Sequence, residues 1–298
     1  MPELPEVEVV RSGLEPAVTG ATVTRIEVLD ERSLRRHDGP AEDFIQRLTG
    51  AVLGAPQRRG KFLWVPVVDP SGAEPGEALT IHLGMSGQVL LRERAEARDR
   101  LTRVVLELRH PERRESRIDF VDQRIFGSMA LDHLVPTADH PEQSVPSRVA
   151  HIARDPIDPL FDDRAFLTAL ARKQTTIKRA LLDQTLISGV GNIYADESLW
   201  AARVHYDQPT ATLSRARAIA LLAEVRAVLG KALAEGGTSF DAQYVNVNGA
   251  SGYFSHSLNA YGRHGEPCPR CGRPIVRESF MNRGSHFCAH CQRVTVAR

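Results

Sequence analysis

The pattern of apolar and polar positions begins with a helical period. Val7, Val10 and Leu14 recur at the spacing that places side chains on one face of an α-helix, which predicts a helix over residues 3–15. Pro16 and Gly20 follow and mark its end, because proline and glycine commonly stand at or just beyond the end of a helix. The chain is therefore expected to open with one amphipathic helix that ends near Pro16.

Residues 22–130 follow a different pattern, in which short apolar or alternating runs are separated by polar loops. Such runs predict β-strands, here at residues 23–28, 62–65, 78–82 and 103–108. Because helical stretches do not alternate with these runs, the pattern favours a β-sandwich over a doubly wound parallel sheet.

The second half of the chain is helical in pattern, with predicted helices at residues 163–171, 175–186, 193–203 and 211–235. Five prolines between positions 136 and 159 indicate a connection between domains. We therefore predict an α+β protein with a strand domain, a linker, a helical domain and a small C-terminal module, at residues 1–135, 136–159, 160–259 and 260–294.

The composition is that of an ordinary globular chain. Its 298 residues are 42% hydrophobic and 25% charged, which suits one large domain or two of common size. No apolar run approaches about 18 residues, and no basic segment precedes an apolar one at the N-terminus, so neither a membrane span nor a signal peptide is expected. A formal net charge of +1 means that any basic surface must be local.

The four cysteines lie together near the C-terminus, at Cys268, Cys271, Cys288 and Cys291. Two pairs with two-residue gaps, separated by 16 residues, predict one tetrahedral zinc ion bound by four thiolates, with a β-hairpin between the pairs. A closed site of this kind is structural. The alternative of two disulfides fits the spacing poorly, and the distribution favours a cytoplasmic protein.

The segment around these cysteines is basic. Residues 261–298 hold seven arginines against two glutamates, a local charge of +5. Such a cluster is typical of a surface that binds phosphate, although a solvated basic tail has the same composition.

The N-terminus offers a nucleophile. Once Met1 is removed, Pro2 presents a secondary amine, which titrates near pH ~8 and can form an iminium with an electrophilic carbon. Glu3 stands beside it as a candidate proton donor and acceptor. Taken alone, these residues also fit an ordinary N-terminus.

Four further segments carry candidate contacts to a phosphate or to a base stack. The turn at residues 188–197 contains two glycines and places Asn192 where the next helix begins, a position suited to phosphate or to simple capping. Lys61 precedes a predicted strand and is either a phosphate ligand or a solvated lysine. Met85 stands between two glycines, and Arg124 and Phe126 stand at a strand end; Met and Phe side chains can wedge into a base stack or fill a core.

Together these segments resemble the formamidopyrimidine-DNA glycosylase family of bacterial base-excision repair enzymes. The resemblance runs from Pro2 to Gln292 and rests on the segments PELPEVE, RRGK, HLGMSG, DQRIFG, GVGNIYADE, the run from Gly252 to Arg263, and the four-cysteine module. It implies an N-terminal β-sandwich that carries the terminal helix, and a C-terminal helical domain with a helix–two-turn–helix element and a β-hairpin zinc finger.

The resemblance also implies catalytic roles. Pro2 would attack C1′ of the damaged nucleotide, Glu3 would help to open the sugar, and Lys61 would hold phosphate and assist elimination. Asn192 and Arg283 would grip the phosphates that flank the lesion.

Other residues would contact DNA. Met85, Arg124 and Phe126 would fill the gap left by the everted base, and further contacts would come from His82, Lys173, Lys178 and Tyr261. Ile125 stands where the family often has a polar or basic residue, so no DNA contact is assigned to it. Residues 238–254 are the candidate loop over the lesion, and a plain polar connection is the alternative.

The implied activity is that of a bifunctional glycosylase and AP lyase. It would excise oxidised purines, 8-oxoguanine and formamidopyrimidines, from duplex DNA through a Schiff base on the N-terminal proline, and cleave the strand by β,δ-elimination. The alternatives are a sister enzyme of the endonuclease VIII type, acting on oxidised pyrimidines, and a zinc-finger protein that only binds DNA. The expected partner is double-stranded DNA with oxidised bases, no membrane is involved, and the resemblance suggests a monomer.

Overall fold

The computed structural model describes the chain apart from residues 1, 69–75, 114, 239–246, 248–253 and 296–298. Its contacts divide into two compact units. The first comprises Met1–His151 with Thr238–Gly252, and the second comprises Ile152–Gly237 with Tyr253–Arg298. Among the helices in the described ranges, none is long and apolar enough to cross a bilayer.

The chain opens with helix α1 (Leu4–Val18), as its apolar period predicts. Glu3 is the N-cap, and a reciprocal capping box joins it to Glu6. The helix continues to Val18, a few residues past the predicted end at about residue 15 and between Pro16 and Gly20, the two residues expected to mark that end. A proline so close to the C-terminal end removes little helical bonding, and Ala17 beside it is buried in the core.

Within its described residues, the first unit is built on ten strands that form one connected sheet, and all their pairings are antiparallel. The strands are β1 (Thr22–Val28), β2 (Val52–Leu53), β3 (Gln57–Arg59), β4 (Phe62–Val68), β5 (Glu77–His82), β6 (Gly87–Glu93), β7 (Thr102–Arg109), β8 (Ser116–Asp122), β9 (Ser128–Pro136) and β10 (Ser144–Pro146). The path runs β10-β9-β5-β4-β2-β1-β7-β8-β6, with β3 paired to β4.

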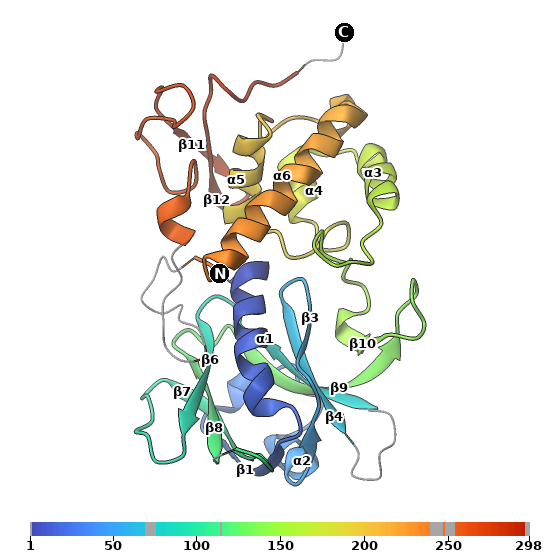
Figure 1. Ribbon diagram of the computed structural model, residues 1–298, viewed down its shortest axis with the longest axis vertical. Coiled ribbons are helices and arrows are strands. Elements are labelled where there is room, and N and C mark those ends of the chain that lie inside the picture. Colours follow the sequence, from blue (N-terminus) through green and yellow to red (C-terminus); the bar gives the residue numbers. More distant parts are fainter. Residues whose placement is uncertain (1, 69–75, 114, 239–246, 248–253, 296–298) are drawn as a thin grey trace. The chain divides into compact units, whose positions relative to one another are not determined.

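Both halves of this path share one core. Side chains from β4, β5 and β9 at one end and from β6, β7 and β8 at the other belong to the same buried cluster, together with the apolar face of α1. In Figure 1 the helix α1 runs beside β3 and β4. This arrangement confirms the predicted sandwich-like strand domain with its N-terminal helix.

The strand domain also contains helical turns that the pattern of short strands did not predict. Helix α2 (Ala41–Leu48) follows Pro40 and buries Phe44 and Leu48, while most of its other side chains are charged or polar. Short 3-10 turns lie at η1 (Glu31–Leu34) and at η2 (Ser147–Val149). With only two fully buried positions in eight residues, α2 gives too weak a period to predict.

The second unit is helical and carries a hairpin. Its helices are α3 (Asp163–Arg172), α4 (Ile177–Leu182), α5 (Asn192–Ala201) and α6 (Arg215–Ala234), with 3-10 turns η3 (Thr210–Thr212) and η4 (Phe254–Ser257). The hairpin is β11 (Val276–Phe280) and β12 (Arg283–Phe287). All four predicted helices are present, and α6 starts late because Ser214 caps it through a bond from the Arg217 amide.

Candidate active site and nucleic-acid interface

A small pocket in the first unit brings together three of the predicted site residues. Pro2, Lys61 and His82 line it, with Val7 of α1 and the 83–84 backbone segment as its remaining wall. Pro2 is buried, whereas Lys61 and His82 are half-buried. A candidate nucleophile therefore shares an opening with a cation and an imidazole, although the three come from the N-terminus, a hairpin turn and a strand end.

The start of α1 holds Pro2 and Glu3 in place. The Glu3 amide donates to Oε2 of Glu6 at 2.8 Å, and the Glu3 carbonyl accepts from the Val7 amide at 3.2 Å. The other Glu6 oxygen accepts from the amide and hydroxyl of Thr238, at 2.7 and 2.9 Å. Glu3 is 2% exposed, so both catalytic candidates sit on a fixed, buried backbone.

Lys61 is positioned by a tight turn. It forms, with Gly60, the two-residue connection between β3 and β4, in which Arg59 pairs with Phe62. Gly60 has a φ of 57°, a value that two-residue hairpins require and that glycine adopts without strain. The turn thus delivers the lysine to the pocket at a defined point.

His82 is held as a neutral imidazole. Burial lowers its pKa to about 4, and the nearby cations of Arg36, Arg35 and Lys61 contribute to the same shift. Its Nδ1 accepts a hydrogen bond from the Gly84 amide at 3.1 Å, so the single proton of the neutral ring sits on Nε2. His82 therefore offers one N–H donor near neutral pH.

The predicted wedge residues stand on two loops at the strand ends. Met85, on the loop between β5 and β6, is 39% exposed, and Phe126, on the loop between β8 and β9, is 47% exposed. Arg124 is exposed as well. Large apolar side chains at such exposure are not core residues, which removes the alternative of a packing role for Met85 and Phe126.

One buried carboxylate joins the two wedge loops. Asp122 is fully buried, and its Oδ1 accepts from the Ser86 hydroxyl at 2.5 Å and from the Arg124 amide at 3.2 Å. Its Oδ2 accepts from the Gly127 amide at 2.7 Å. Gly84 lets the loops approach closely, because a Cβ there would lie 2.4 Å from the Phe126 carbonyl carbon. The wedge residues therefore sit on one braced platform.

In the second unit, Asn192 and Arg283 are linked through the hairpin. Asn192 is the first residue of α5, and its Nδ2 donates to the carbonyl of Gly284 at 3.0 Å. Arg283 is the exposed neighbour of that glycine. It follows a two-residue turn in which Met281 and Asn282 both have positive φ, the geometry of a type I′ hairpin.

Lys178 lies inside the second unit, where it makes protein contacts. Its side chain is fully buried, and its Nζ contacts Oδ1 of Asp196 at 2.6 Å and the Ser285 hydroxyl at 3.0 Å. The Asp196 Oδ2 atom accepts from the His286 amide at 2.8 Å. This network ties α4 and α5 to the strand that carries Arg283.

The other two predicted contacts are partly accessible. Lys173 caps the end of α3 and pairs with Asp183 at 2.6 Å, with 37% of its side chain exposed. Tyr261 is half-buried, and its ring meets the ring of His286 edge-on at 4.9 Å. The Tyr261 amide donates to Glu197 at 2.8 Å, a contact that fixes this residue beside the finger.

The four cysteines form a metal-binding group. Their Sγ atoms all lie within 4.8 Å of one another, and none is in a disulfide. Bonds of about 2.3 Å to a tetrahedral zinc ion would separate the sulfurs by about 3.8 Å, so the arrangement fits. Burial would raise the pKa of Cys268, but hydrogen bonds from the Trp200 indole and from the Arg270 and Cys271 amides lower it to about 6. A thiolate is thereby favoured at that position.

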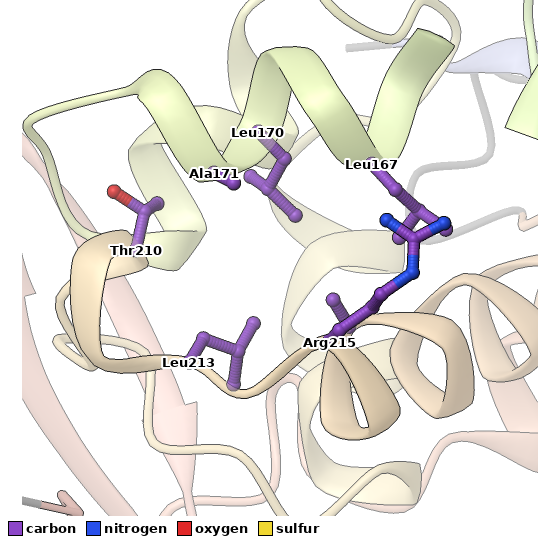
Figure 2. A pocket seen from close by; sticks show the side chains of 7 residues that line it. Leu167, Leu170, Ala171, Thr210, Leu213 and Arg215 are labelled. Atoms are coloured by element: carbon purple, nitrogen blue, oxygen red, sulfur yellow. The ribbon is translucent and has the colours of Figure 1, made fainter. Parts of the chain in front are cut away.

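A separate apolar pocket lies in the second unit, between α3 and the segment that leads into α6 (Figure 2). Leucine and alanine side chains line most of it, and Arg215 stands at its edge; the lining is Leu167, Leu170, Ala171, Thr210, Leu213, Arg215 and Ala218. No predicted site residue contributes to it, so the candidate chemistry belongs to the pocket around Pro2.

Sequence reasoning missed the residues that position the site. Glu6 could have been found, since Glu3 and Glu6 have the spacing of a capping box. Asp196 carries no local signal, because Lys178 and His286 lie 18 and 90 positions away from it, and Asp122 joins its own loop to Ser86, which lies 36 positions away. The proposed lesion-covering loop, residues 238–254, lies mostly outside the described residues, at 239–246 and 248–253.

Comparison with known proteins covers nearly the whole chain. The N-terminal domain model of formamidopyrimidine-DNA glycosylase matches residues 1–129, the H2TH domain model of the same enzyme matches 152–243, and the zinc finger found in FPG and IleRS matches 265–294. A formamidopyrimidine-DNA glycosylase of Leifsonia xyli subsp. xyli is 63% identical, over 99% of this chain and 100% of its own length.

Solved structures of a protein from the same family are also similar to this chain. Lactococcus lactis Fpg in complex with DNA containing N7-benzyl-Fapy-dG has a TM-score of 0.82 at 30% identity, and covers 98% of this chain and 99% of its own. The same protein with DNA containing an oxidised pyrimidine has a TM-score of 0.81 at 30% identity, with coverage of 98% and 99%.

Proposed function

Because the chain belongs to the formamidopyrimidine-DNA glycosylase family, we propose that Pro2 is the nucleophile with which it excises oxidised purines from duplex DNA. The observation that carries this proposal is the pocket that Pro2 shares with Lys61 and His82, next to the buried carboxylate residue Glu3. An amine, a phosphate-binding cation and a proton carrier are the groups that glycosyl transfer to an amine requires.

The chemistry balances on these groups. The Pro2 nitrogen attacks C1′, the N-glycosidic bond breaks, and the purine leaves with the bonding electrons and takes up the proton that the attacking nitrogen releases. Glu3 gives a proton to O4′ as the sugar ring opens, which leaves an iminium on Pro2. The iminium acidifies the C2′ protons, so that loss of one expels the 3′ phosphate, and a second elimination expels the 5′ phosphate.

Phosphate contacts come from both units. Lys61 and the Nε2–H of neutral His82 bind the DNA phosphate near the reacting sugar. Arg283 and the start of α5 at Asn192 grip the flanking phosphates, where the helix dipole adds to the attraction. Lys173 and Tyr261 extend this surface. Lys178, paired with buried Asp196, supports it by holding the hairpin.

The wedge residues offset the cost of base eversion. Flipping a nucleotide out of the duplex costs a few kcal/mol, and a side chain that enters the vacated stack recovers part of that cost. Met85 and Phe126 are exposed on the platform braced by Asp122, with Arg124 beside them to face the orphaned base. Zinc, held by Cys268, Cys271, Cys288 and Cys291, folds the finger that carries Arg283 and takes no part in the bond changes.

A trapping experiment tests the assignment. Borohydride should reduce the iminium and join the protein covalently to a duplex that contains 8-oxoguanine opposite cytosine. Pro2→Gly should lower trapping by about a hundredfold or more while duplex binding persists, because the secondary amine is lost. The matched control is Pro40→Gly, at the exposed N-cap of α2, which should trap like the wild type.

The second candidate is action on oxidised pyrimidines, which is favoured by the likeness to Lactococcus lactis Fpg bound to such DNA. Duplexes with 5-hydroxycytosine, run in parallel, separate the two substrate classes. Faster trapping on the pyrimidine duplex would reverse our order of substrates, and no trapping on any damaged duplex would reject the enzyme assignment.

A further inference from the structure

Arg35 makes an unusual set of contacts with the loop that carries two wedge residues. It follows η1 directly, and its Nη1 donates to the carbonyls of Ile125 at 2.8 Å and Gly127 at 2.7 Å. Its Nη2 donates to the carbonyl of Phe126. One guanidinium thus binds three successive carbonyls that lie about 90 positions away in the sequence.

The loop needs such a partner. Ile125 has a φ of 56°, and the left-handed conformation costs a residue with a Cβ roughly 1–2 kcal/mol. Three carbonyl dipoles that converge on one point also repel each other unless a cation lies between them. The planar, always charged guanidinium of arginine, with five N–H donors, suits this task better than a lysine ammonium.

Arg35 and Asp122 hold opposite polar groups of the same loop. Asp122 accepts from the amides of Arg124 and Gly127, whereas Arg35 donates to the carbonyls. Among the described residues, Arg35 forms no ion pair with a carboxylate, so its charge is directed to the loop. The backbone between the exposed side chains of Arg124 and Phe126 is therefore fixed from both sides.

We propose that Arg35 is a positioning residue for DNA recognition, which sets the backbone of residues 125–127 so that Arg124 and Phe126 enter the gap left by the everted base and face the orphaned base in the opposing strand. The proposal rests on the proposed function, and it adds a residue that touches neither the sugar nor the base. Its effect should appear only where an opposing strand is present.

Two substitutions separate position from charge. Arg35→Met removes both, whereas Arg35→Lys keeps the cation near His82 but cannot bind three carbonyls in a plane. The matched control is Arg32→Met, three residues earlier, whose exposed guanidinium bonds to Asp30.

The experiment compares two substrates under single-turnover conditions. Both Arg35 variants should excise 8-oxoguanine opposite cytosine about tenfold or more slowly, the loss expected when hydrogen bonds from a charged donor no longer hold the loop. Trapping on single-stranded DNA with a preformed abasic site should stay within about twofold, because it needs no wedge. Arg32→Met should match the wild type on both.

A fluorescent base analogue reports directly whether the wedge residues enter the duplex. With 2-aminopurine placed opposite a tetrahydrofuran abasic analogue, wild type and Arg32→Met should change the probe's fluorescence on binding, and both Arg35 variants should give a smaller change at saturation. Wild-type behaviour of Arg35→Lys in both assays, or equal losses on duplex and single strand, would overturn the proposal. A wild type inactive on both substrates would instead contradict the proposed function, and this inference with it.

Discussion

Two buried aspartates, one in each unit, both hold backbone in place, but the groups that bind their carboxylates differ. Asp122 holds the wedge loops through two amides and a hydroxyl, all neutral donors. Asp196 holds the finger hairpin through the His286 amide, and its charge is paired with the buried ammonium of Lys178. In both places a carboxylate fixes the backbone beside an exposed side chain that we propose to contact DNA.

The two aspartates differ in which groups are left unpaired when the carboxylate is removed. Removing one partner of a buried ion pair strands a charge, which costs about 3–5 kcal/mol. Removing a carboxylate with neutral donors leaves unpaired N–H groups, which cost about 1–3 kcal/mol. The finger should therefore fail by unfolding locally, and the wedge platform should fail by losing its geometry.

Zinc removal should disrupt the finger more than any single substitution, since zinc binding contributes about 10–16 kcal/mol to the folding of isolated zinc-finger peptides. Trp200 donates to Cys268, whereas Trp64 is buried in the strand unit, and these are the two tryptophans of the chain. A chelator should therefore change the emission of Trp64→Phe protein and leave that of Trp200→Phe protein unchanged. Duplex affinity should fall and return with zinc. Unchanged affinity in metal-free protein would contradict the finger's role.

Asp196→Ala should destabilise the protein by about 3–5 kcal/mol in chemical denaturation, because Lys178 is left charged in the interior. Replacing both residues, as Asp196→Leu with Lys178→Met, should recover much of that loss. The control Asp207→Ala changes an exposed carboxylate and should stay within about 0.5 kcal/mol. A double variant as unstable as the single one would show that the charge pair is not the reason.

Asp122→Asn should cost about 1–3 kcal/mol, because an amide offers one acceptor oxygen where the carboxylate offers two. Excision from duplex should slow more than lyase action on a preformed single-stranded abasic site. Asp38→Asn, on an exposed aspartate of the same unit, is the control. Equal loss on both substrates would argue against a role confined to the wedge loops.

The smallest effect concerns His82. Its pKa of about 4 lies below the usual value of 6.5, so the unfolded chain binds a proton that the folded protein does not, and this group lowers stability as the pH falls from about 6.5 towards 4. Compared with His82→Gln, the wild type should lose about 1–2 kcal/mol more between pH 7 and pH 5. If the two proteins lost stability equally as the pH fell, the pKa of His82 would not be lowered in the folded protein.

The sequence predicted the parts of the molecule whose signals are local. The helical period of α1, the cysteine spacing and the strand runs around Phe62 and Ile81 each need only neighbouring residues, and all three appear in the structure. Lys178 shows the limit of such prediction, because one of its hydrogen-bond partners in the interior, Ser285, lies 107 positions away. Arg35 likewise acts on a loop that no short motif connects to it.

Peptide mapping of the borohydride-reduced complex tests most directly whether Pro2 carries the chemistry. After nuclease and protease digestion, the reduced sugar fragment should be found on the N-terminal peptide, attached to the Pro2 nitrogen of chains that have lost Met1. Pro2→Gly protein should yield at most a trace of this adduct. A fragment attached to Lys61, or to any other lysine, would contradict the assignment of Pro2 as the nucleophile.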